Sequence, residues 1–326
     1  MTVNTLENLT FRPYQEEDLD PLIEIMKASR IKQGEPPLVN RDEMRHQVSN
    51  PLINWERDTK VALDGDRLIA LNLAAMLPTG QAFGVEIIHP DYADGPLREH
   101  FVRTGEDMIR ARFDEIAEPA PVYIHRNARE DRTDRLDLYA KLGYVENRRF
   151  YEMKIDFGEE AISAPDLPDG IELRPFDPEQ HAKAAWQAHQ ESFRDHFGHV
   201  RDTPYEEWSR ELENPTFDPN LWLMAWDGDE IAGVAFNRVD TSEEKTGHVN
   251  ILGVRRAWRK RGLGGALLRH TFHMFQAQGY EHVNLGVDAA SKTNAVALYE
   301  NAGMYVNECM VSMRKVLRGD EDDIKD

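Results

Sequence analysis

Apolar and polar residues alternate along one short segment near the middle of the C-terminal half. Residues 247–254 have a period of two, which predicts a β-strand that places His248, Asn250 and Leu252 on one face. The intervening residues, apolar or glycine, would then lie on the other face. We expect the two polar side chains of this strand to face a cleft.

The following segment changes from a period of two to a helical period. Leu263, Ala266, Leu267 and Met274 are offset by 3, 4 and 11 positions from the first of them, so they share one face of a predicted helix. Gly279 provides the stop signal. Because the apolar face has to lie on a sheet, the start of this helix is fixed at the open end of the sheet.

The turn between this strand and this helix is basic and rich in glycine. Gly262, Gly264 and Gly265 let several backbone N–H groups point into one small space, and the helix start adds the positive end of its dipole. Such a turn is suited to an anion, and we interpret that anion as a pyrophosphate. Five positive charges lie within seven positions here, at Arg255, Arg256, Arg259, Lys260 and Arg261.

The basic run could by itself indicate a nucleic-acid or localisation patch. Its position at a glycine turn that opens a helix favours the phosphates of a cofactor instead. A nucleoside triphosphate loop would need Gly-Lys-Ser/Thr, and a dinucleotide fingerprint would need a third small residue at Leu267, so neither pattern fits.

Two linked motifs carry a resemblance to a known family. Arg259, Gly262 and Gly264, after a strand that ends at Val254, resemble the acetyl-CoA signature of the GNAT N-acetyltransferase superfamily. Residues 294–304 resemble the superfamily's Asn-x-x-Ala-x-x-Leu-Tyr-Glu-x-x-Gly-Phe segment, with Met in the last place. The resemblance implies acetyl-CoA as cosubstrate and no metal. The residues it assigns to acetyl-CoA are Leu252, Gly253, Val254, Arg259, Lys260, Arg261, Gly262, Leu263, Gly264, Gly265 and Asn294.

The resemblance also implies catalytic roles for two side chains. Tyr299 matches the tyrosine that gives a proton to the leaving CoA thiolate, and His248 stands where many members carry a glutamate base. Each has a simpler interpretation: Tyr299 could pack in a short amphipathic helix, and His248 could be a hydrogen-bonded strand residue. Asn294 could likewise be a helix cap by residue type alone.

The chain repeats itself with a period of about half its length. Arg12 in Phe-Arg-Pro-Tyr recurs 162 positions later as Arg174 in Leu-Arg-Pro-Phe, and Gly143 recurs 160 positions later as Gly303. We therefore expect an α/β fold of two tandem GNAT domains, each a mostly antiparallel, mixed sheet flanked by helices. The expected boundaries are a degenerate N-terminal domain at 1–157, a linker at 158–170, an acetyl-CoA-binding domain at 171–318 and an acidic tail at 319–326.

The two halves differ at the phosphate turn. The N-terminal counterpart carries Asp91 and Asp94 in place of arginines, and Pro96 lacks an N–H donor. We infer that the N-terminal half kept the fold and lost the cofactor site. It either buries surface or walls the acceptor pocket of the other half.

Composition excludes several classes of function. The chain has 326 residues, enough for two cores, and a formal net charge of −20, which disfavours nucleic acids and anionic membranes as partners. It contains no apolar run of 18 residues, and its first residues lack a signal region, so we expect a cytoplasmic protein. The single cysteine, Cys309, excludes an internal disulfide and a multi-cysteine metal site.

Tandem architecture with one degenerate half most resembles mycothiol synthase-like members of the superfamily. We therefore expect acetyl transfer from acetyl-CoA to a primary amine of a small molecule or peptide by direct attack. Acetylation of a cysteinyl amine, as in mycothiol synthesis, is one alternative, and His248 in place of the strand glutamate departs from that pattern. A CoA-binding sensor without turnover is another.

Overall fold

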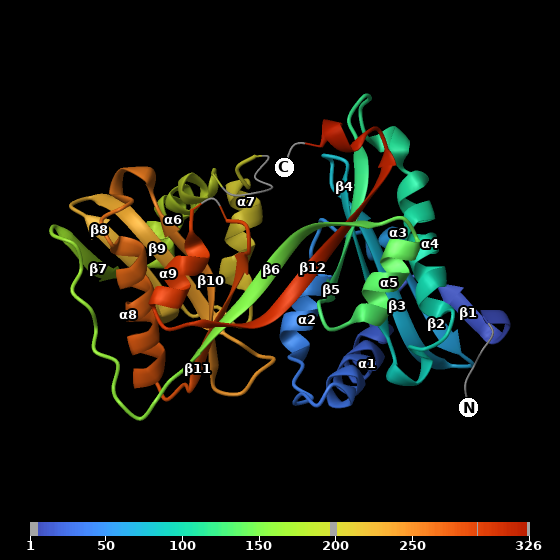
Figure 1. Ribbon diagram of the computed structural model, residues 1–326, viewed down its shortest axis with the longest axis horizontal. Helices are drawn as coiled ribbons and strands as arrows, with labels where there is room; N and C mark the ends of the chain where they lie inside the picture. Colours follow the sequence, from blue (N-terminus) through green and yellow to red (C-terminus); the bar gives the residue numbers. More distant parts are fainter. Residues whose placement is uncertain (1–5, 196–200, 292, 325–326) are drawn as a thin grey trace. The chain divides into compact units, whose positions relative to one another are not determined.

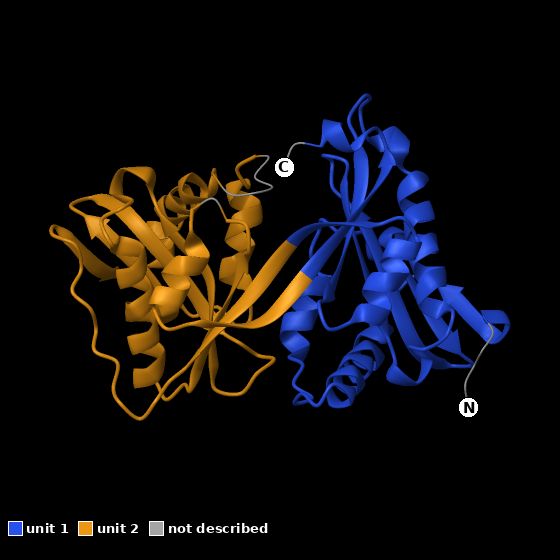
Figure 2. Cartoon of the chain, viewed as in Figure 1, with its two compact units in different colours: residues 1–148, 311–325 blue, residues 149–310, 326 orange. Residues whose placement is uncertain are grey.

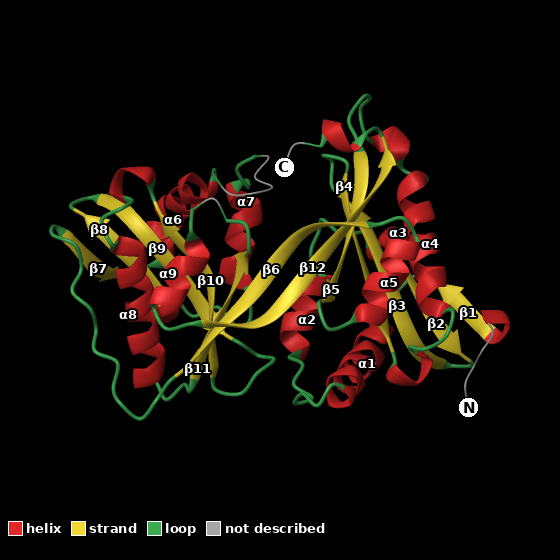
Figure 3. Cartoon of the chain, viewed as in Figure 1, coloured by secondary structure: helices red, strands yellow, loops and turns green. Residues whose placement is uncertain are grey.

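The computed structural model describes residues 6–195, 201–291 and 293–324. The chain divides into two compact units, residues 1–148 with 311–325 and residues 149–310 with 326 (Figure 2). Each unit is a mixed sheet with helices packed against it (Figure 3).

The elements of the two units follow one another in the same order, which confirms the duplication (Figure 1). Each series has a first strand, two or three helices, three strands, a long helix, a strand, a short helix and a long last strand. The first series comprises β1 (Leu9–Arg12), α1 (Leu19–Lys32), α2 (Arg41–Val48), α3 (Trp55–Asp58), β2 (Thr59–Asp64), β3 (Arg67–Met76), β4 (Gln81–Ile88), α4 (Leu97–Arg110), β5 (Val122–Arg129), α5 (Thr133–Lys141) and β6 (Val145–Asp156). The second comprises β7 (Ile171–Pro175), α6 (Pro178–Phe193), α7 (Tyr205–Trp208), β8 (Trp222–Asp227), β9 (Glu230–Val239), β10 (Thr246–Val254), α8 (Leu263–Ala277), β11 (His282–Asp288), α9 (Ala295–Asn301) and β12 (Tyr305–Arg318).

The last strand of each series completes the sheet of the other unit. β6 pairs antiparallel with β11 of the second unit, with Phe150 opposite Asp288 and Asp156 opposite His282. β12 follows β5 in the strand order, and its residues from Val311 onward belong to the first unit. Both strands change colour partway along in Figure 2. The units therefore divide within β6 and β12, and not in the segment 158–170.

The segment 158–170 contains no helix or strand and lies along α8 of the second unit. Gln276 of α8 donates from Nε2 to the carbonyls of Gly158 and Glu160, and its Oε1 accepts from the N–H of Ile162 at 2.6 Å. His273 contacts the Ile162 carbonyl through Nδ1. The apolar face of α8, on the opposite side of the helix, packs against the sheet.

The sheet of the second unit is covered on both faces. On one face, Leu263 and Leu267 of α8 pack with Ala232 and Ala235 of β9. On the other, α6 packs with β8 and β9 through a cluster of alanines and aromatic rings. The predicted strand and helix of residues 247–279 are both present, and Gly279 follows α8 with φ of +86°.

A β-bulge at Asn250 changes the predicted facing of β10. The register with β9 shifts between Val249 and Ile251, so Asn250 is an extra residue. Val249 consequently packs with the core on the α8 side, whereas Ile251 packs with the core on the α6 side. The prediction that His248 and Leu252 share one face is therefore wrong, because simple alternation does not include the bulge.

In the described ranges, none of the helices combines the length and the apolar character that a membrane crossing requires.

We expect the two halves of the chain to be unable to fold separately. A piece cut off within 158–170 loses β12 from the first unit, and with it the buried Met313; the second piece loses β6 and the fully buried Met153. Each loss leaves an unpaired strand edge and a gap in a core. Circular dichroism should show no cooperative melting of either piece alone and recovery of a transition on mixing. A first piece that melts cooperatively alone would contradict this expectation.

Candidate active site

The parallel strands β10 and β11 begin side by side and then separate. Their pairing runs from Thr246 opposite His282 to Val249 opposite Leu285. β10 continues to Val254, and its pairing with β9 on the other side continues to the same residue. The last residues of β10 therefore have no ladder partner on the β11 side.

The backbone of Leu252 and Val254 faces this opening. The N–H of Arg255 donates to the carbonyl of Ala232 in β9 at 3.0 Å. Because backbone groups of a strand alternate in direction, the N–H groups one and three positions earlier point away from β9. They are the amides of Val254 and Leu252. Gly253 between them lies against α6, where a Cβ would be 2.9 Å from Cβ of Ser192.

The turn after β10 presents its backbone amides without a side-chain cap. Lys260 and Gly262 have φ of +62° and +82°, and Gly262 is the N-cap residue of α8. Left-handed residues in a short turn can direct neighbouring backbone N–H groups toward one point. The first amides of α8, including those of Leu263 and Gly265, add to them. The Leu263 side chain itself is buried in the core.

The basic residues of the turn fall into two groups. Lys260 and Arg261 are exposed, and no side-chain partner for them is found among the described residues. The guanidinium of Arg259 instead donates to the carbonyls of Val254 and Ser192 at 3.0 Å each and to Asp195 at 2.7 Å.

Two further arginines also hold the turn to the end of α6. Arg255 donates to Glu191 at 2.7 Å, and Arg256 pairs with Asp195. The hydrogen bonds from Arg256 and Arg259 hold the pKa of the Asp195 carboxyl well below its usual range. These arginines position the turn, and their charge is largely met within the chain.

Gly264 is the point where three predicted segments converge. A Cβ at this position would lie 3.3 Å from Cδ1 of Leu298 in α9 and 3.7 Å from Cγ2 of Val254 in β10. The first turn of α8, the end of β10 and the helix that carries Tyr299 thus meet at one place.

Tyr299 is buried in α9, and burial raises its pKa to about 12. None of the described side chains or backbone groups hydrogen-bonds its hydroxyl. Asn294 is the N-cap residue of α9, with φ of +57°, yet its side chain makes no capping hydrogen bond and is exposed. Neither polar side chain therefore has a hydrogen-bond partner among the described residues.

The same strand separation occurs in the first unit, where side chains fill it. β4 and β5 pair only from Gln81 to Gly84 on β4. Beyond this point the Glu86 carboxylate accepts a hydrogen bond from the Tyr139 hydroxyl at 2.8 Å and pairs with Arg126. Arg98, in the first turn of α4, approaches the same carboxylate at 3.7 Å.

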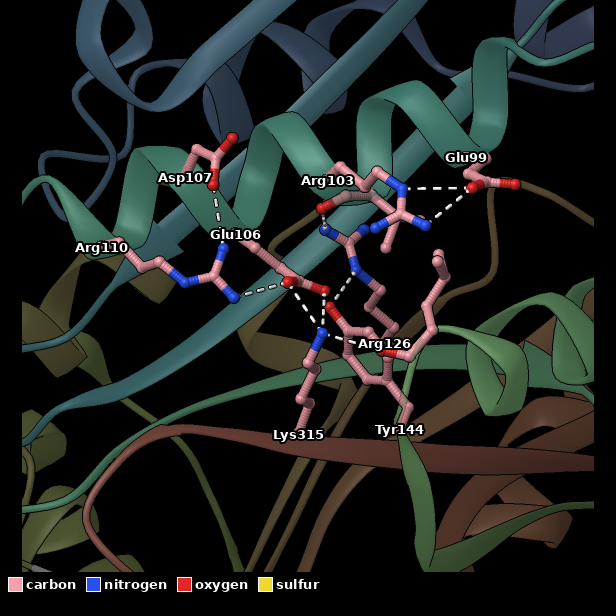
Figure 4. A network of polar contacts seen from close by, with 10 residues as sticks. Glu99, Arg103, Glu106, Asp107, Arg110, Arg126, Tyr144 and Lys315 are labelled. Carbon is pink, nitrogen blue, oxygen red and sulfur yellow. Dashed lines mark hydrogen bonds and ion pairs between the residues drawn. The ribbon is translucent and has the colours of Figure 1, made fainter.

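Arg126 also belongs to a second network of polar contacts, which Figure 4 shows with Tyr144, Glu106 and Lys315. It is 1% exposed, and its Nε donates to the Tyr144 hydroxyl at 3.0 Å. A Cβ at either Gly84 or Gly105 would lie within 2.7 Å of the guanidinium, so both glycines make room for it. Lys315 of β12 pairs with Glu106 of α4 at 2.9 Å beside it.

The turn of the first unit also lacks the anion-binding backbone. Between Ile88 and Leu97 no residue has a positive φ, and Pro96 is the N-cap of α4. Asp91 and Asp94 are exposed there. Tyr139, the counterpart of Tyr299, is held by a carboxylate of its own chain.

His248 lies on the α6 side of the sheet, opposite Arg238 of β9 and Asn284 of β11. Its Nδ1 is 2.6 Å from Oδ1 of Asn284. His248 is four positions away from the amide of Leu252, and the bulge lies between them. His248 instead contacts Asn284, which the sequence analysis did not select. The polar alternation of His282, Asn284 and Asp288 in β11 is the signal that could have indicated it.

A hollow opens next to the bulge. Trp222 and Phe236 stack with ring centroids 3.9 Å apart and form its aromatic wall with Phe217. The remaining lining residues are polar: Glu211, Asn214, Thr216, Asn237, Arg238 and Asn250. Sequence reasoning had not selected this wall.

Comparisons with known proteins find similar chains of one family. Residues 182–304 match the acetyltransferase (GNAT) family. A mycothiol acetyltransferase of Geodermatophilus obscurus is 28% identical over 91% of this chain and 96% of its own length. A GCN5-related N-acetyltransferase of Sphaerobacter thermophilus is 26% identical, covers 96% of this chain and 97% of its own, and superposes with a TM-score of 0.79.

The duplicated architecture also has a solved counterpart. A tandem GNAT protein from the clavulanic acid biosynthesis pathway covers 96% of this chain and 100% of its own, with a TM-score of 0.72 at 13% identity, and so shares the fold. Residues 182–304 therefore form an N-acetyltransferase domain of the GNAT family, within a chain that has the tandem GNAT architecture.

Proposed function

We propose that this enzyme transfers the acetyl group of acetyl-CoA to a primary amine of a small molecule or peptide by direct attack. The observation that carries the proposal is the separation of β10 from β11, which lies beside an uncapped helix start and the helix that carries Tyr299. The first unit has the same opening closed by Glu86 and Arg126. We infer one acetyl-CoA site per chain.

The residues fit a CoA ester. A pyrophosphate is an anion that needs several N–H donors at once, and the backbone from Lys260 to Gly265 provides them at a helix N-terminus. The exposed side chains of Lys260 and Arg261 add charge, while Arg259 contributes by holding the turn. Asn294, at the start of α9, adds a side-chain amide.

The proposed chemistry uses the backbone of β10 and the buried tyrosine. Acetyl-CoA supplies a thioester whose acetyl carbon accepts an amine. The amide of Leu252 would donate to the acetyl oxygen as negative charge develops on it. With a pKa of about 12, Tyr299 keeps its proton at neutral pH and can give it to the departing thiolate.

His248 is proposed as the group that accepts the proton of the amine. Four strand residues span about 13 Å, so the proton would travel through water from an amine placed near Leu252. The hollow beside Asn250 lies along this route, because Arg238 both lines it and pairs across the sheet with His248. We place part of the acceptor there.

A second candidate function is acetylation of a cysteinyl amine in mycothiol synthesis. The name and full-length coverage of the Geodermatophilus obscurus relative support it. The polar groups and aromatic wall of the hollow suit an acceptor with hydroxyl or amine donors beside apolar surface.

Release of free CoA thiol on addition of acetyl-CoA and a panel of amines tests the proposal. The panel should include amino sugars, cysteinyl amino sugars, polyamines and peptides. Thiol release that requires an amine supports the enzyme. Tight binding of acetyl-CoA without release under any acceptor would instead support a CoA-binding sensor.

Replacement of Tyr299 by Phe should lower kcat by about 100-fold or more and leave acetyl-CoA affinity nearly unchanged, because a positioned acid is worth about 10²- to 10⁴-fold. Steady-state kinetics and calorimetry measure the two effects. Tyr139→Phe is the matched control, since it removes a hydroxyl from the equivalent place in the first unit, where it bonds Glu86. Unchanged kcat in the Tyr299 variant, with chemistry rate-limiting, would exclude Tyr299 from the mechanism.

Replacement of Gly262 by Ala should abolish measurable acetyl-CoA binding. The substitution strains a left-handed residue, costing about 1 kcal/mol of stability, and displaces the amides of the turn. Gly279→Ala is the matched control, because Gly279 has φ of +86°, has no atom within 4 Å of an added Cβ, and lies at the other end of α8. Calorimetry should find binding only in the control. Equal affinities in both variants would contradict the proposed phosphate site.

A further inference from the structure

A chain of three polar side chains extends away from His248. Nδ1 of His248 contacts Oδ1 of Asn284 at 2.6 Å, and Nδ2 of Asn284 donates to Oδ2 of Asp240 at 2.8 Å. The three residues come from β10, β11 and the loop after β9.

Asp240 is a fixed hydrogen-bond acceptor at the end of this chain. Its Oδ1 accepts from the N–H of Ser242 at 2.8 Å and from the Ser242 hydroxyl at 2.6 Å. Its own N–H donates to the carbonyl of Thr246 at 2.9 Å, which ties the loop to the start of β10. Although burial opposes it, these hydrogen bonds and that from Asn284 lower the pKa of the Asp240 carboxyl, so it is ionised at neutral pH.

The ionised carboxylate determines which way the Asn284 amide points. A carboxylate can only accept, so Asn284 has to turn its NH₂ group toward Asp240 and its oxygen toward His248. Asn284 is 3% exposed, so water does not offer an easy alternative partner. An amide oxygen can only accept as well, and Nδ1 of His248 must therefore carry the hydrogen.

We propose that Asp240 and Asn284 are positioning residues that hold neutral His248 in the Nδ1–H tautomer, with the lone pair on Nε2. This inference rests on the proposed function for its catalytic consequence, since the Nε2 lone pair is what would accept the proton of the acceptor ammonium and pass it to solvent. The tautomer itself does not depend on that function.

The neutral amide between His248 and Asp240 has a consequence for proton affinity. A carboxylate in direct contact with an imidazole strongly stabilises the charged form. The Asn284 spacer keeps the anion one side chain away, so orientation is fixed with a smaller effect on charge. This suits a base that has to release its proton near neutral pH.

Other titratable groups lie on the strands and the helix that pack around this site. Arg238 lies opposite His248 on β9, and Lys154 of β6 lies opposite Asn284 and pairs with Glu243. On α6, His189 accepts from the Trp208 indole at 3.0 Å. Arg238 opposes protonation of His248, whereas Asp240 favours it.

The test is ¹⁵N NMR of the histidine side chains in the full-length protein, with the His248 signals assigned from their loss in His248→Gln. We expect neutral His248 to be protonated at Nδ1. Two variants should shift the population of neutral His248 toward Nε2–H. Asn284→Leu removes the acceptor of the Nδ1–H group, and Asp240→Asn removes the requirement on the orientation of the Asn284 amide. Ser242→Ala is the control, because it leaves the Oδ2 contact in place and should leave the tautomer unchanged. Protonation at Nε2 in the unmodified protein would overturn the proposal.

Kinetics separate this proposal from the proposed function. Asn284→Leu and Asp240→Asn should lower kcat/KM for the amine by about 10-fold or more with acetyl-CoA affinity unchanged. In Asp240→Asn the ascending limb of the pH profile should also move to lower pH, because loss of the anion destabilises the imidazolium. If NMR finds the Nδ1–H tautomer but His248→Gln keeps full activity, then His248 is not the base, although Asp240 and Asn284 still position its ring. If the tautomer of His248 is unchanged in both variants, Asp240 and Asn284 do not position it. Asp240→Asn keeps the shape of the side chain, so this test holds even if Asn284→Leu is unstable.

Discussion

The separation of two parallel strands imposes a requirement on each unit of this protein. Where β10 leaves β11, and where β4 leaves β5, strand backbone loses its ladder partner on one side. Buried N–H and C=O groups without partners are costly, so the opening has to be occupied by side chains, by water or by a ligand. The two units satisfy the same requirement differently, and their difference in proposed function follows from it.

In the first unit the chain provides its own occupant. Glu86 takes hydrogen bonds and charge from Tyr139, Arg126 and Arg98, and all four side chains are buried. A buried ion pair offsets its desolvation only when its remaining polar atoms are also met, and here the aromatic hydroxyls contribute to that. Gly84 and Gly105 have to be glycines in this arrangement, because a Cβ at either position would collide with the Arg126 guanidinium. In the second unit the corresponding positions carry Leu252, an uncapped helix and a tyrosine without such a partner.

The sequence predicts the duplicated order of elements because strand alternation, helical periodicity and glycine turns are local signals. It also predicts the turn at Gly262, where a positive φ and an absent cap follow from residue type. Other features depend on partners remote in sequence. Arg259 was expected at the phosphates, yet it bonds Asp195 and Ser192 at the end of α6, and nothing local to residues 255–261 indicates those acceptors.

Other features depend on how strands pair with one another. The exchange of β6 and β12 leaves the repeat period unchanged, since each strand keeps its place in the sequence while completing the other sheet. The bulge at Asn250 is one extra residue in an otherwise regular alternation, and it moved His248 and Leu252 to opposite faces. The contact of His248 with Asn284 depends on the parallel register of β10 and β11, which a single sequence does not determine.

The central claim is that the opening in the second unit holds acetyl-CoA and that in the first does not. Hydrogen–deuterium exchange of the intact protein, with and without acetyl-CoA, tests it at the level of single segments. We predict added protection of the amides from Leu252 to Val254 and from Lys260 to Gly265, with no change from Glu86 to Arg98. Protection of the segment 86–98 by the ligand, or none in the segment 252–265 at a saturating concentration, would contradict the account.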